Sequence, residues 1–250
     1  MPTPLSVIIL TYNEAERLPL CVEAVRPLGD EILIVDSGST DGTVRLANEL
    51  GTKVLERPMK NWAEQRNWAM DQAKCLWVLF IDADEVLDEA LQNSILGWKE
   101  QSHENTKGYW GLKRAHYFQG KRMRFSGLQS DVVVRLFHRS QRFADRAVHE
   151  KLDLQKPKPL PGILHHHTYL NHERWENKQR SYAAKSALDK DRSTGALTPF
   201  HFIIKPAFRF AKHYLLRGGI LDGRAGWNYS ISMAQGVYWR YVEMKKLRNS

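Results

Sequence analysis

The sequence predicts an α/β fold with a mostly parallel central sheet and a helical C-terminal appendage. In the first 108 residues, short apolar runs rich in β-branched residues alternate with segments of helical apolar spacing, which is typical of βαβ units. After about residue 108 the segments become strand-like, and from about residue 170 long helical segments follow. The 250 residues suffice for one large domain with such an appendage.

Each expected element has its own signal. Continuous runs of Val, Ile and Leu, as in strands covered on both faces, predict strands at 6–10, 31–35, 53–55 and 76–81. Apolar residues at helical spacing predict helices at 15–25, 43–50 and 62–73. The second part should contain strands at 109–118, 132–138 and 143–148, an extended proline-rich connector at 156–161, and helices at 173–191, 199–216 and 227–246. The helix at 199–216 is expected to kink at Pro206.

Charge is distributed unevenly along the chain. Residues 1–110 carry 10 Lys and Arg against 18 Asp and Glu, whereas residues 111–250 carry 27 against 10. A strongly basic region attracts nucleic acid, phosphorylated substrates or anionic membranes. No RNP, KH or helix-turn-helix signature occurs, so nucleic acid is not expected as the partner.

Composition and targeting signals exclude several classes of protein. An apolar fraction of 42% and a charged fraction of 26% exclude a disordered or collagen-like chain. Two cysteines, Cys21 and Cys75, cannot form a disulfide framework and suggest a reducing compartment. The apolar runs at 7–10 and 76–81 are too short for a signal peptide or a membrane span. We therefore expect a cytoplasmic protein, able to sit peripherally on the cytoplasmic face of the inner membrane.

Polar loops follow three of the predicted parallel strands, at 11–14, 36–43 and 82–85. Ligands of open parallel sheets bind at the carboxyl ends of the strands. Each loop taken singly could instead be a turn or a helix cap. Three acidic loops at one edge of the sheet favour a binding site.

The pair Asp82 and Asp84 is the most informative feature of these loops. Two neighbouring carboxylates repel each other, and Mg²⁺ or Mn²⁺ commonly bridges such oxygens to substrate phosphates. The sequence contains neither G-x-G-x-x-G after the first strand nor a P-loop. The pair therefore indicates a metal-bound diphosphate outside those two nucleotide-binding motifs.

The order VIILTYNE, VDSGSTDGT, QRNWA and LFIDADE resembles the inverting glycosyltransferases of family 2, whose nucleotide-sugar-binding fold is of the GT-A type. The second half resembles a narrower branch, the β-1,4-glucosyltransferases of bacterial lipopolysaccharide inner-core synthesis. Four motifs carry this resemblance: R-L-F at 135–137, V-H-E at 148–150, the pair at 165–166 and G-G-x-x-D-G at 218–223. The resemblance implies a nucleotide-sugar-binding half at 1–108, an acceptor and catalytic half of the same domain at 109–170, and a basic helical region at 171–250.

The resemblance also implies roles for individual residues at the donor site. The nucleoside would be bordered by three residues of the first loop, Thr11, Tyr12 and Glu14. Asp36 would hydrogen-bond a uracil ring, so the expected donor is a UDP-sugar.

Three more residues would handle the rest of the donor. Arg66 would approach the phosphates or the second aspartate of the D-x-D motif. Asp82 would meet the ribose or the sugar, and Asp84 would bind the metal, Mg²⁺ or Mn²⁺.

An inverting transfer also needs a carboxylate that takes the proton of the acceptor. The family often places it in an E-D or D-D pair, and no E-D pair occurs in the second half. We favour Glu150 in V-H-E, with Asp131 second; the alternative for Glu150 is an ion pair with a neighbouring Arg. In the triplet 165–167, alternation places only His165 and His167 on one face, and hydrogen bonds to diphosphate or carbonyls are favoured over metal ligation.

The segment 200–217 interleaves aromatic and basic residues. Such a helix is typical of a membrane interface, anchored here by Phe202 and Phe208, although it could be an ordinary packing helix. The expected activity is transfer of a hexose, from UDP-glucose, to a membrane-anchored saccharide such as the lipopolysaccharide inner core, at an anionic membrane surface. Alternatives are a polyprenyl-phosphate or peptide glycosyltransferase, and a non-catalytic nucleotide- or polyanion-binding protein, which the intact D-x-D disfavours.

Overall fold

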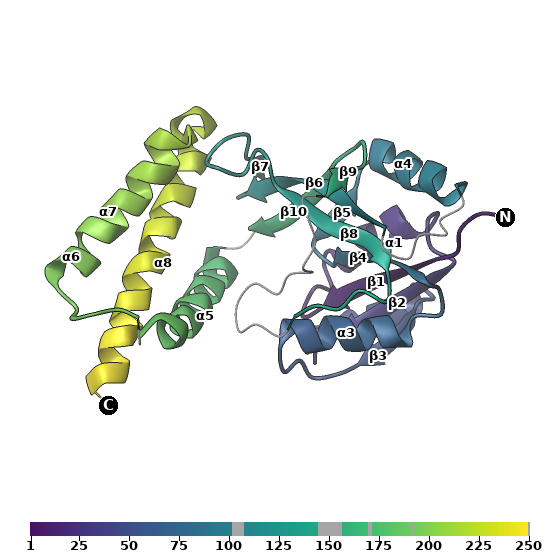
Figure 1. The fold of residues 1–250 in the computed structure, drawn as a ribbon, viewed down its shortest axis with the longest axis horizontal. Coiled ribbons are helices and arrows are strands. Elements are labelled where there is room, and N and C mark those ends of the chain that lie inside the picture. The colour runs from purple at the N-terminus through teal and green to yellow at the C-terminus, as the bar shows by residue number, and fades with distance from the viewer. Residues whose placement is uncertain (102–107, 145–156, 170–171, 192, 250) are drawn as a thin grey trace. The chain divides into compact units, whose positions relative to one another are not determined.

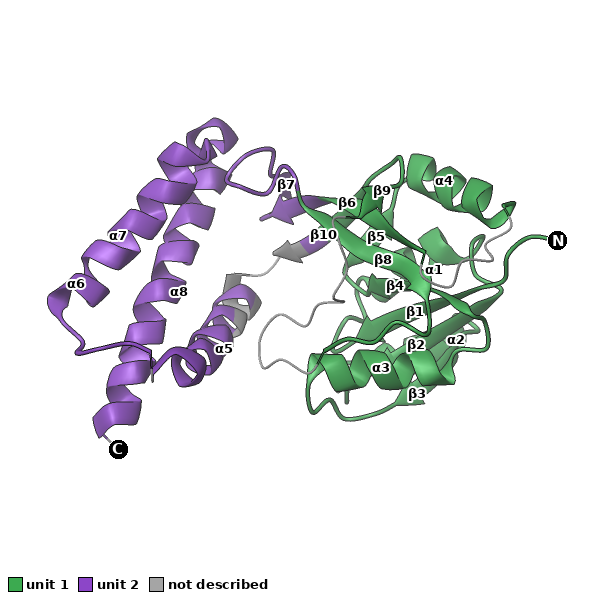
Figure 2. Cartoon of the chain, viewed as in Figure 1, with its two compact units in different colours: residues 1–114, 131–166 green, residues 115–130, 167–250 purple. Residues whose placement is uncertain are grey.

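A computed structural model describes residues 1–101, 108–144, 157–169, 172–191 and 193–249 (Figure 1). The chain forms two compact units (Figure 2). Unit 1 comprises Met1–Arg114 and Asp131–His166, and unit 2 comprises Ala115–Ser130 and His167–Ser250. The functional division expected at residues 108 and 170 concerns roles rather than compactness, and it stays a prediction.

Unit 1 is built on a parallel sheet, as the sequence predicts. Strand β1 (Leu5–Thr11) pairs in parallel with β2 (Glu31–Asp36) and β4 (Trp77–Asp82), and β2 pairs in parallel with β3 (Lys53–Glu56). Strand β8 (Val132–His138) then joins β4 in the antiparallel sense. The full strand order is β3-β2-β1-β4-β8-β6-β10-β5, with β6 at Tyr109–Phe118, β10 at Leu164–Tyr169 and β5 at Glu85–Leu87. The short strands β7 (Lys121–Arg122) and β9 (Lys158–Pro159) pair with β6.

Helices cover both faces of this sheet because successive strand residues point to opposite sides. Val7 and Ile9 of β1 pack with α1 (Leu18–Val25), α2 (Thr43–Glu49) and α4 (Glu89–Lys99). Ile8 and Leu10 pack with α3 (Trp62–Gln72) on the other face. The strands are therefore buried on both faces, which explains their unbroken apolar runs.

Three features of unit 1 were not predicted. Strand β5 and helix α4 directly follow the acidic loop, and Asp88 caps α4 by accepting from the N–H of Leu91 at 2.8 Å. The triplet 165–167 lies in strand β10, and Phe143 lies outside any strand. Residues 145–148 of the expected strand at 143–148 fall outside the described residues.

Unit 2 is mostly helical. Its longest helix, α8 (Arg224–Asn249), packs against α5 (His172–Asp191), α6 (Pro199–Phe202) and α7 (Ile204–Ala211). A π-helical turn at Lys212–Leu216 and a 3₁₀ helix at Gly219–Asp222 connect α7 to α8. Phe118 and Met123 of the discontinuous segment share a core with Trp175, Ala225 and Tyr229.

The prediction of a helix kink at Pro206 is wrong. The helical segment breaks at Ile203, and Pro206 is the third residue of α7. An N–H in the first turn of a helix has no partner within the helix, so proline removes no hydrogen bond there.

The G-G-x-x-D-G motif closes unit 2. The buried carboxylate of Asp222 accepts from the N–H groups of Arg124 and Phe125, at 2.9 and 3.1 Å, and from the hydroxyl of Ser126 at 2.9 Å. Gly218 and Gly223 have φ angles of 70° and 62°, which suit glycine. Asp222 thus holds the segment before β8 against the connection between α7 and α8.

Candidate active site at the carboxyl edge of the sheet

Hydrogen bonds join the first two polar loops to each other. Asn13, in the left-handed region with φ 55°, donates its N–H to Ser39 Oγ at 2.7 Å and accepts from the N–H of Thr40 at 2.7 Å. The N–H of Glu14 donates to Thr43 Oγ1 at 2.9 Å. The sequence prediction that these loops meet at one edge of the sheet is confirmed.

Asp36 organises the second loop. Its side chain is completely buried at the end of β2 and accepts three hydrogen bonds from within the loop. Oδ1 accepts from the N–H groups of Gly38 and Ser39 at 2.9 and 2.7 Å, and Oδ2 accepts from Ser39 Oγ at 2.5 Å. Gly38 has φ 97°, which this turn requires. The turn geometry considered from the sequence is therefore present, and it fixes the orientation of the Asp36 carboxylate.

The nucleoside residues expected in the first loop lie at the same edge. Thr11 is 3% exposed, and its Oγ1 has no hydrogen-bond partner in the described part of the chain. Tyr12 is 56% exposed, and Glu14 forms an ion pair with Arg17 at 2.9 Å. At this edge Tyr12 therefore presents an exposed aromatic ring, whereas the hydroxyl of Thr11 is buried.

The first carboxylate of the D-x-D motif is neutralised by arginines. Arg135 Nη2 lies 2.5 Å from Asp82 Oδ2 and 2.6 Å from Glu85 Oε1, and Arg66 Nη2 lies 3.4 Å from Asp82 Oδ1. Glu85 Oε2 also accepts the N–H of Asp82 at 3.0 Å. Arg135 comes from β8, so the R-L-F motif provides the main counter-charge.

These contacts determine the protonation of the group. Burial favours a raised pKa for Asp82, but Arg135 and Arg66 outweigh it and hold the pKa well below its usual range. Burial acts to lower the pKa of Arg135, and Asp82 and Glu85 raise it instead. The two arginines thus keep Asp82 ionised without a metal ion, and the expectation that Asp84 rather than Asp82 binds the metal stays a prediction.

The second carboxylate faces a histidine. Asp84 Oδ2 lies 3.4 Å from His166 Nε2, and both side chains are 13% exposed. From the sequence, alternation grouped His165 with His167, and His166 entered only through the 165–166 pair of the resemblance. Alternation along a strand does not say which face meets the acidic loop. The antiparallel pairing of His166 with Glu85 in β10 and β5 supplies that information.

The donor pair Asp84 and His166 fits a divalent cation. Adjacent ligands of an octahedral cation at about 2.1 Å lie about 3 Å apart, close to the separation seen here. Carboxylate oxygen suits Mg²⁺ and Mn²⁺, and imidazole is a general ligand of transition metals. Among the described residues no group of three or more such side chains assembles, so phosphate oxygens and water would complete the coordination.

Arg66 is held by aromatic rings as well as by Asp82. Its guanidinium lies over Phe80 and Phe143, 5.6 and 5.3 Å from the ring centroids. The next residue, Asn67, exchanges two hydrogen bonds with the backbone of Phe143, at 3.0 and 2.9 Å. The QRNWA helix thus fixes the backbone just before residues 145–156.

The two candidate bases differ in what the structure shows. Glu150 lies outside the described residues. Asp131 is engaged by Arg114, whose Nε and Nη2 lie 2.8 and 2.7 Å from Asp131 Oδ2. An arginine partner stabilises the ionised carboxylate and weakens it as a proton acceptor.

The mostly parallel sheet, with acidic loops at the carboxyl ends of its strands, is a glycosyltransferase fold of the GT-A type. The chain belongs to the family described as "Glycosyl transferase family 2", which it matches over residues 6–145. The chain is therefore a transferase with glycosyltransferase activity, and the family expected from the sequence is confirmed.

Relatives and a solved structure extend this likeness over nearly the whole chain. The lipopolysaccharide core biosynthesis glycosyltransferase LpsC of Rhizobium meliloti is 28% identical over 96% of this chain and 93% of its own length. An uncharacterised glycosyltransferase of Rickettsia typhi is 26% identical over 98% of this chain and 86% of its own. A mannosyltransferase of Pyrobaculum calidifontis, solved with GDP-mannose and Mn²⁺, shares the fold with a TM-score of 0.56, 15% identity and coverage of 98% and 89%.

Proposed function

We propose that the protein is an inverting, metal-dependent hexosyltransferase that moves glucose from UDP-glucose to a saccharide of the lipopolysaccharide inner core. The observation that carries this proposal is the arrangement of Asp84 and His166 beside the arginine-bound Asp82. The similarity to LpsC over both chains supports the acceptor class.

The donor would lie across the carboxyl ends of β1, β2 and β4. Tyr12 and Thr11 would border the nucleoside, and the preoriented carboxylate of Asp36 would accept from the base. An acceptor oxygen at this position would suit the ring N–H of uracil, which is a donor. Asp82 would accept from a ribose or sugar hydroxyl while Arg135 keeps it ionised.

Asp84 and His166 would hold the cation, which when bound supplies positive charge against the departing diphosphate. Arg66, anchored over two rings, would add a second positive charge there. The acceptor hydroxyl would attack the anomeric carbon from the face opposite the diphosphate. As the new C–O bond forms, the bond to the diphosphate oxygen breaks, and the carboxylate of Glu150 takes the hydroxyl proton.

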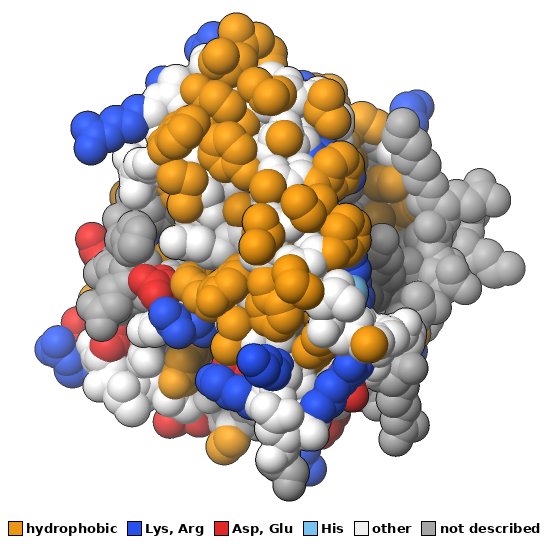
Figure 3. Space-filling view, turned by 90° about the vertical axis from the view of Figure 1, so that its left-hand side faces the viewer, with side chains coloured by type: hydrophobic (Ala, Val, Ile, Leu, Met, Phe, Trp, Pro, Cys, Tyr) orange, Lys and Arg blue, Asp and Glu red, His pale blue; other side chains and the backbone are white. Residues whose placement is uncertain are grey.

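The acceptor would be presented at a membrane surface. No helix of the described chain is long and apolar enough to cross a bilayer. Unit 2 instead exposes large apolar side chains, and Figure 3 shows hydrophobic side chains gathered on the side where α6 and α7 lie, with Lys and Arg at the edges. We propose peripheral binding to the cytoplasmic face of the inner membrane through this unit, in keeping with the two free cysteines.

A donor assay tests the first part of this proposal. The protein is incubated without acceptor with UDP-glucose, other UDP-sugars and GDP-mannose, in Mn²⁺ or in EDTA, and release of the nucleotide is measured. Slow hydrolysis confined to UDP-glucose and Mn²⁺ or Mg²⁺ supports the proposal. Hydrolysis of GDP-mannose alone, or hydrolysis that EDTA leaves unchanged, would overturn it.

An acceptor assay tests the second part. Truncated lipopolysaccharide core, a polyprenyl phosphate and an acceptor peptide are offered with the preferred donor. Transfer to the core saccharide is expected, with inverted anomeric configuration by NMR. Transfer to the polyprenyl phosphate or the peptide instead would assign the acceptor to one of the two alternatives.

A further inference from the structure

Among its described residues, unit 2 holds a group of cations that have no carboxylate partner. It carries 18 Lys and Arg against 6 Asp and Glu. Glu176, Glu243 and Asp191 pair with Arg180, Lys246 and Arg248, and the Asp222 carboxylate is taken up by the segment before β8. Within the described part of the chain, no carboxylate forms an ion pair with any of four residues, which we call the cation cluster: Lys205, Arg209, Arg217 and Arg240.

Two members of the cation cluster, Lys205 and Arg240, meet at one side chain. Lys205 Nζ and Arg240 Nη2 both donate to the hydroxyl of Tyr241, at 3.0 and 3.3 Å. The same two cations lie over the Tyr241 ring, 5.0 and 4.9 Å from its centroid. Two positive side chains from α7 and α8 therefore meet at one phenol.

Arg209 shares this electrostatic environment. It is half-buried, and burial together with Arg240 and Arg217 lowers its pKa. Burial acts to raise the pKa of Tyr241, but Lys205 and Arg240 lower it instead. The Nε of Arg240 is buried and has no hydrogen-bond partner in the described chain. Like charges are thus held together, partly away from water, and the N–H at Arg240 Nε remains available as a hydrogen-bond donor.

We propose that the cation cluster is a binding site for a phosphate group. A phosphate oxyanion offers several strong acceptors and the negative charge that the cluster lacks, and guanidinium groups match its geometry in bidentate fashion. The site lies wholly within unit 2 and goes beyond the proposed transfer of sugar. Its assignment to a lipid deepens the membrane binding proposed above and rests on that proposal. It explains why cations gather where no acid neutralises them.

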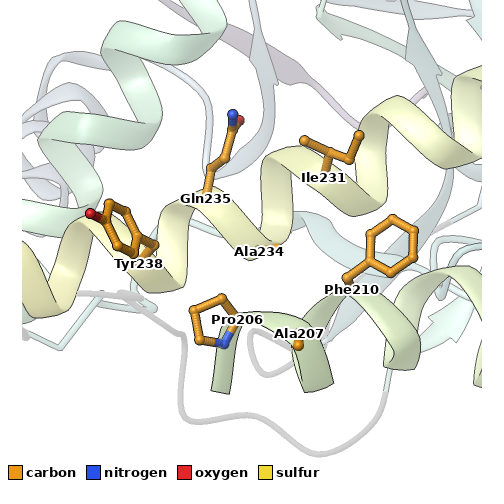
Figure 4. A pocket seen from close by; sticks show the side chains of 7 residues that line it. All are labelled: Pro206, Ala207, Phe210, Ile231, Ala234, Gln235 and Tyr238. Carbon is orange, nitrogen blue, oxygen red and sulfur yellow. The ribbon is translucent and has the colours of Figure 1, made fainter. Parts of the chain in front are cut away.

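The surroundings favour the headgroup of a membrane lipid as the source of the phosphate. Ile203, directly before α7, is 64% exposed, and Ile204 and Phe208 of α7 are 52% and 61% exposed. No residue of this helix is buried. A shallow apolar groove of about 320 Å³ also lies between α7 and α8, with Pro206 and Phe210 facing Ile231 and Tyr238 (Figure 4). Apolar side chains next to phosphate-binding cations fit the boundary between headgroups and acyl chains.

The test compares the full-length parent with Arg209→Gln and Arg240→Gln. Lys245→Gln is the matched control, because Lys245 is an exposed lysine of α8 that carries the same charge. Thermal unfolding midpoints are measured as inorganic phosphate replaces chloride at constant ionic strength. Flotation with phosphatidylglycerol vesicles and with phosphatidylcholine vesicles forms a second arm.

Without phosphate, both cluster variants should unfold at or above the temperature of the parent, because each removes a repulsion. Phosphate should raise the midpoint of the parent and of Lys245→Gln, and its apparent affinity should fall at least about tenfold in both cluster variants. Equal phosphate responses in all four proteins, or no response of the parent, would overturn the site. So would cluster variants that are less stable than the parent and respond to phosphate as it does.

The vesicle arm identifies the source of the phosphate. Loss of flotation with phosphatidylglycerol in both cluster variants, but not in the control, supports a lipid headgroup. Cluster variants that float like the parent while losing the phosphate response overturn the lipid assignment and leave a soluble phosphate group. Nucleotide release from the donor without acceptor should be unchanged in every variant, so failure here is distinguishable from failure of the proposed transferase function.

Discussion

His166 Nε2 lies 3.4 Å from Asp84 Oδ2, although the two residues come from separate halves of the chain. The pairing of β10 with β5 brings them together. The acidic loop therefore has beside it a ring nitrogen from a strand that lies much further along the sequence.

Replacing His166 by Ala should weaken Mn²⁺-dependent UDP binding by at least about tenfold, since even loss of an outer-shell partner costs about 10- to 100-fold in metal affinity. Asp84→Ala should abolish the metal dependence and the transfer. Calorimetry with UDP in Mn²⁺ and in EDTA measures both. His165→Ala, on the opposite face of the strand, is the control. Unchanged Mn²⁺-dependent affinity in folded His166→Ala would remove it from the cation site.

Asp36→Ala should weaken UDP binding with and without metal, because the carboxylate orders the loop and, in the proposed function, accepts from the base. Loss of hydrogen bonds to a charged group corresponds to about 1.5–3 kcal/mol of binding. Asp41→Ala serves as the comparison, since Asp41 accepts from Thr43 in the same loop and should affect binding less. A metal-dependent loss in Asp36→Ala would speak against its place at the base.

Arg135→Met should lower the free energy of unfolding of unit 1 by about 3–5 kcal/mol, because it removes the nearest counter-charge of Asp82 and Glu85 and leaves them only Arg66 and Arg114, at 3.4 and 3.6 Å. Adding Glu85→Gln to Arg135→Met should recover part of the loss. The measurement is urea-induced unfolding followed by tryptophan fluorescence, and the comparison is Arg139→Met, at the residue directly after the same strand. If the double variant is no more stable than the single one, Glu85 is not the residue that Arg135 stabilises.

The same ion pair predicts a dependence on acid. The pKa of Asp82 in the folded protein lies below its unfolded value of about 3.9. Its contribution to stability is thus fully present above about pH 4 and is lost as the pH falls from there toward the lowered pKa. Stability measured between neutral pH and pH 3 should decline less steeply at its acid end in Asp82→Asn than in the parent. Identical acid profiles would contradict the assignment.

Glu150→Gln should retain donor binding and lose turnover by roughly 10²- to 10⁴-fold, because an amide keeps the shape but accepts no proton. Asp131→Asn is the matched variant and should change turnover less, since Asp131 is tied to Arg114. A larger loss in Asp131→Asn than in Glu150→Gln would move the base to Asp131.

The apolar side of α7 should anchor the protein to vesicles. Ile204 and Phe208 are exposed, whereas Phe202 packs against Tyr238 and Tyr241 with ring centroids 6.2 Å apart. Phe202, expected from the sequence as an anchor, is thus part of the packing of unit 2. Changing Ile204 and Phe208 to Ser should remove the part of vesicle binding that resists salt, and leave the salt-sensitive part. Salt-resistant binding equal to that of the parent would exclude this face.

Local signals in the sequence predicted the parallel sheet, its helices and the meeting of the three loops. These features depend on runs of Val and Ile and on residues directly after each strand, which pattern alone reveals. The partners of the loops could not be predicted in this way, because Arg135 and His166 reach them through antiparallel strands whose register depends on tertiary packing. The break at Ile203 was missed for a similar reason, since the position of a proline within a helix decides its effect.

The discontinuity of unit 2 has a consequence for engineering. The helical C-terminal part is not a detachable module, because its core includes Phe118 and Met123 and its Asp222 holds the backbone at Arg124 and Phe125. A chimera that exchanged only the residues after 166 would pack the helices of one protein against the 115–130 segment of another. Exchange of unit 2 between relatives should therefore require a cassette of two pieces, 115–130 and 167–250, transferred together.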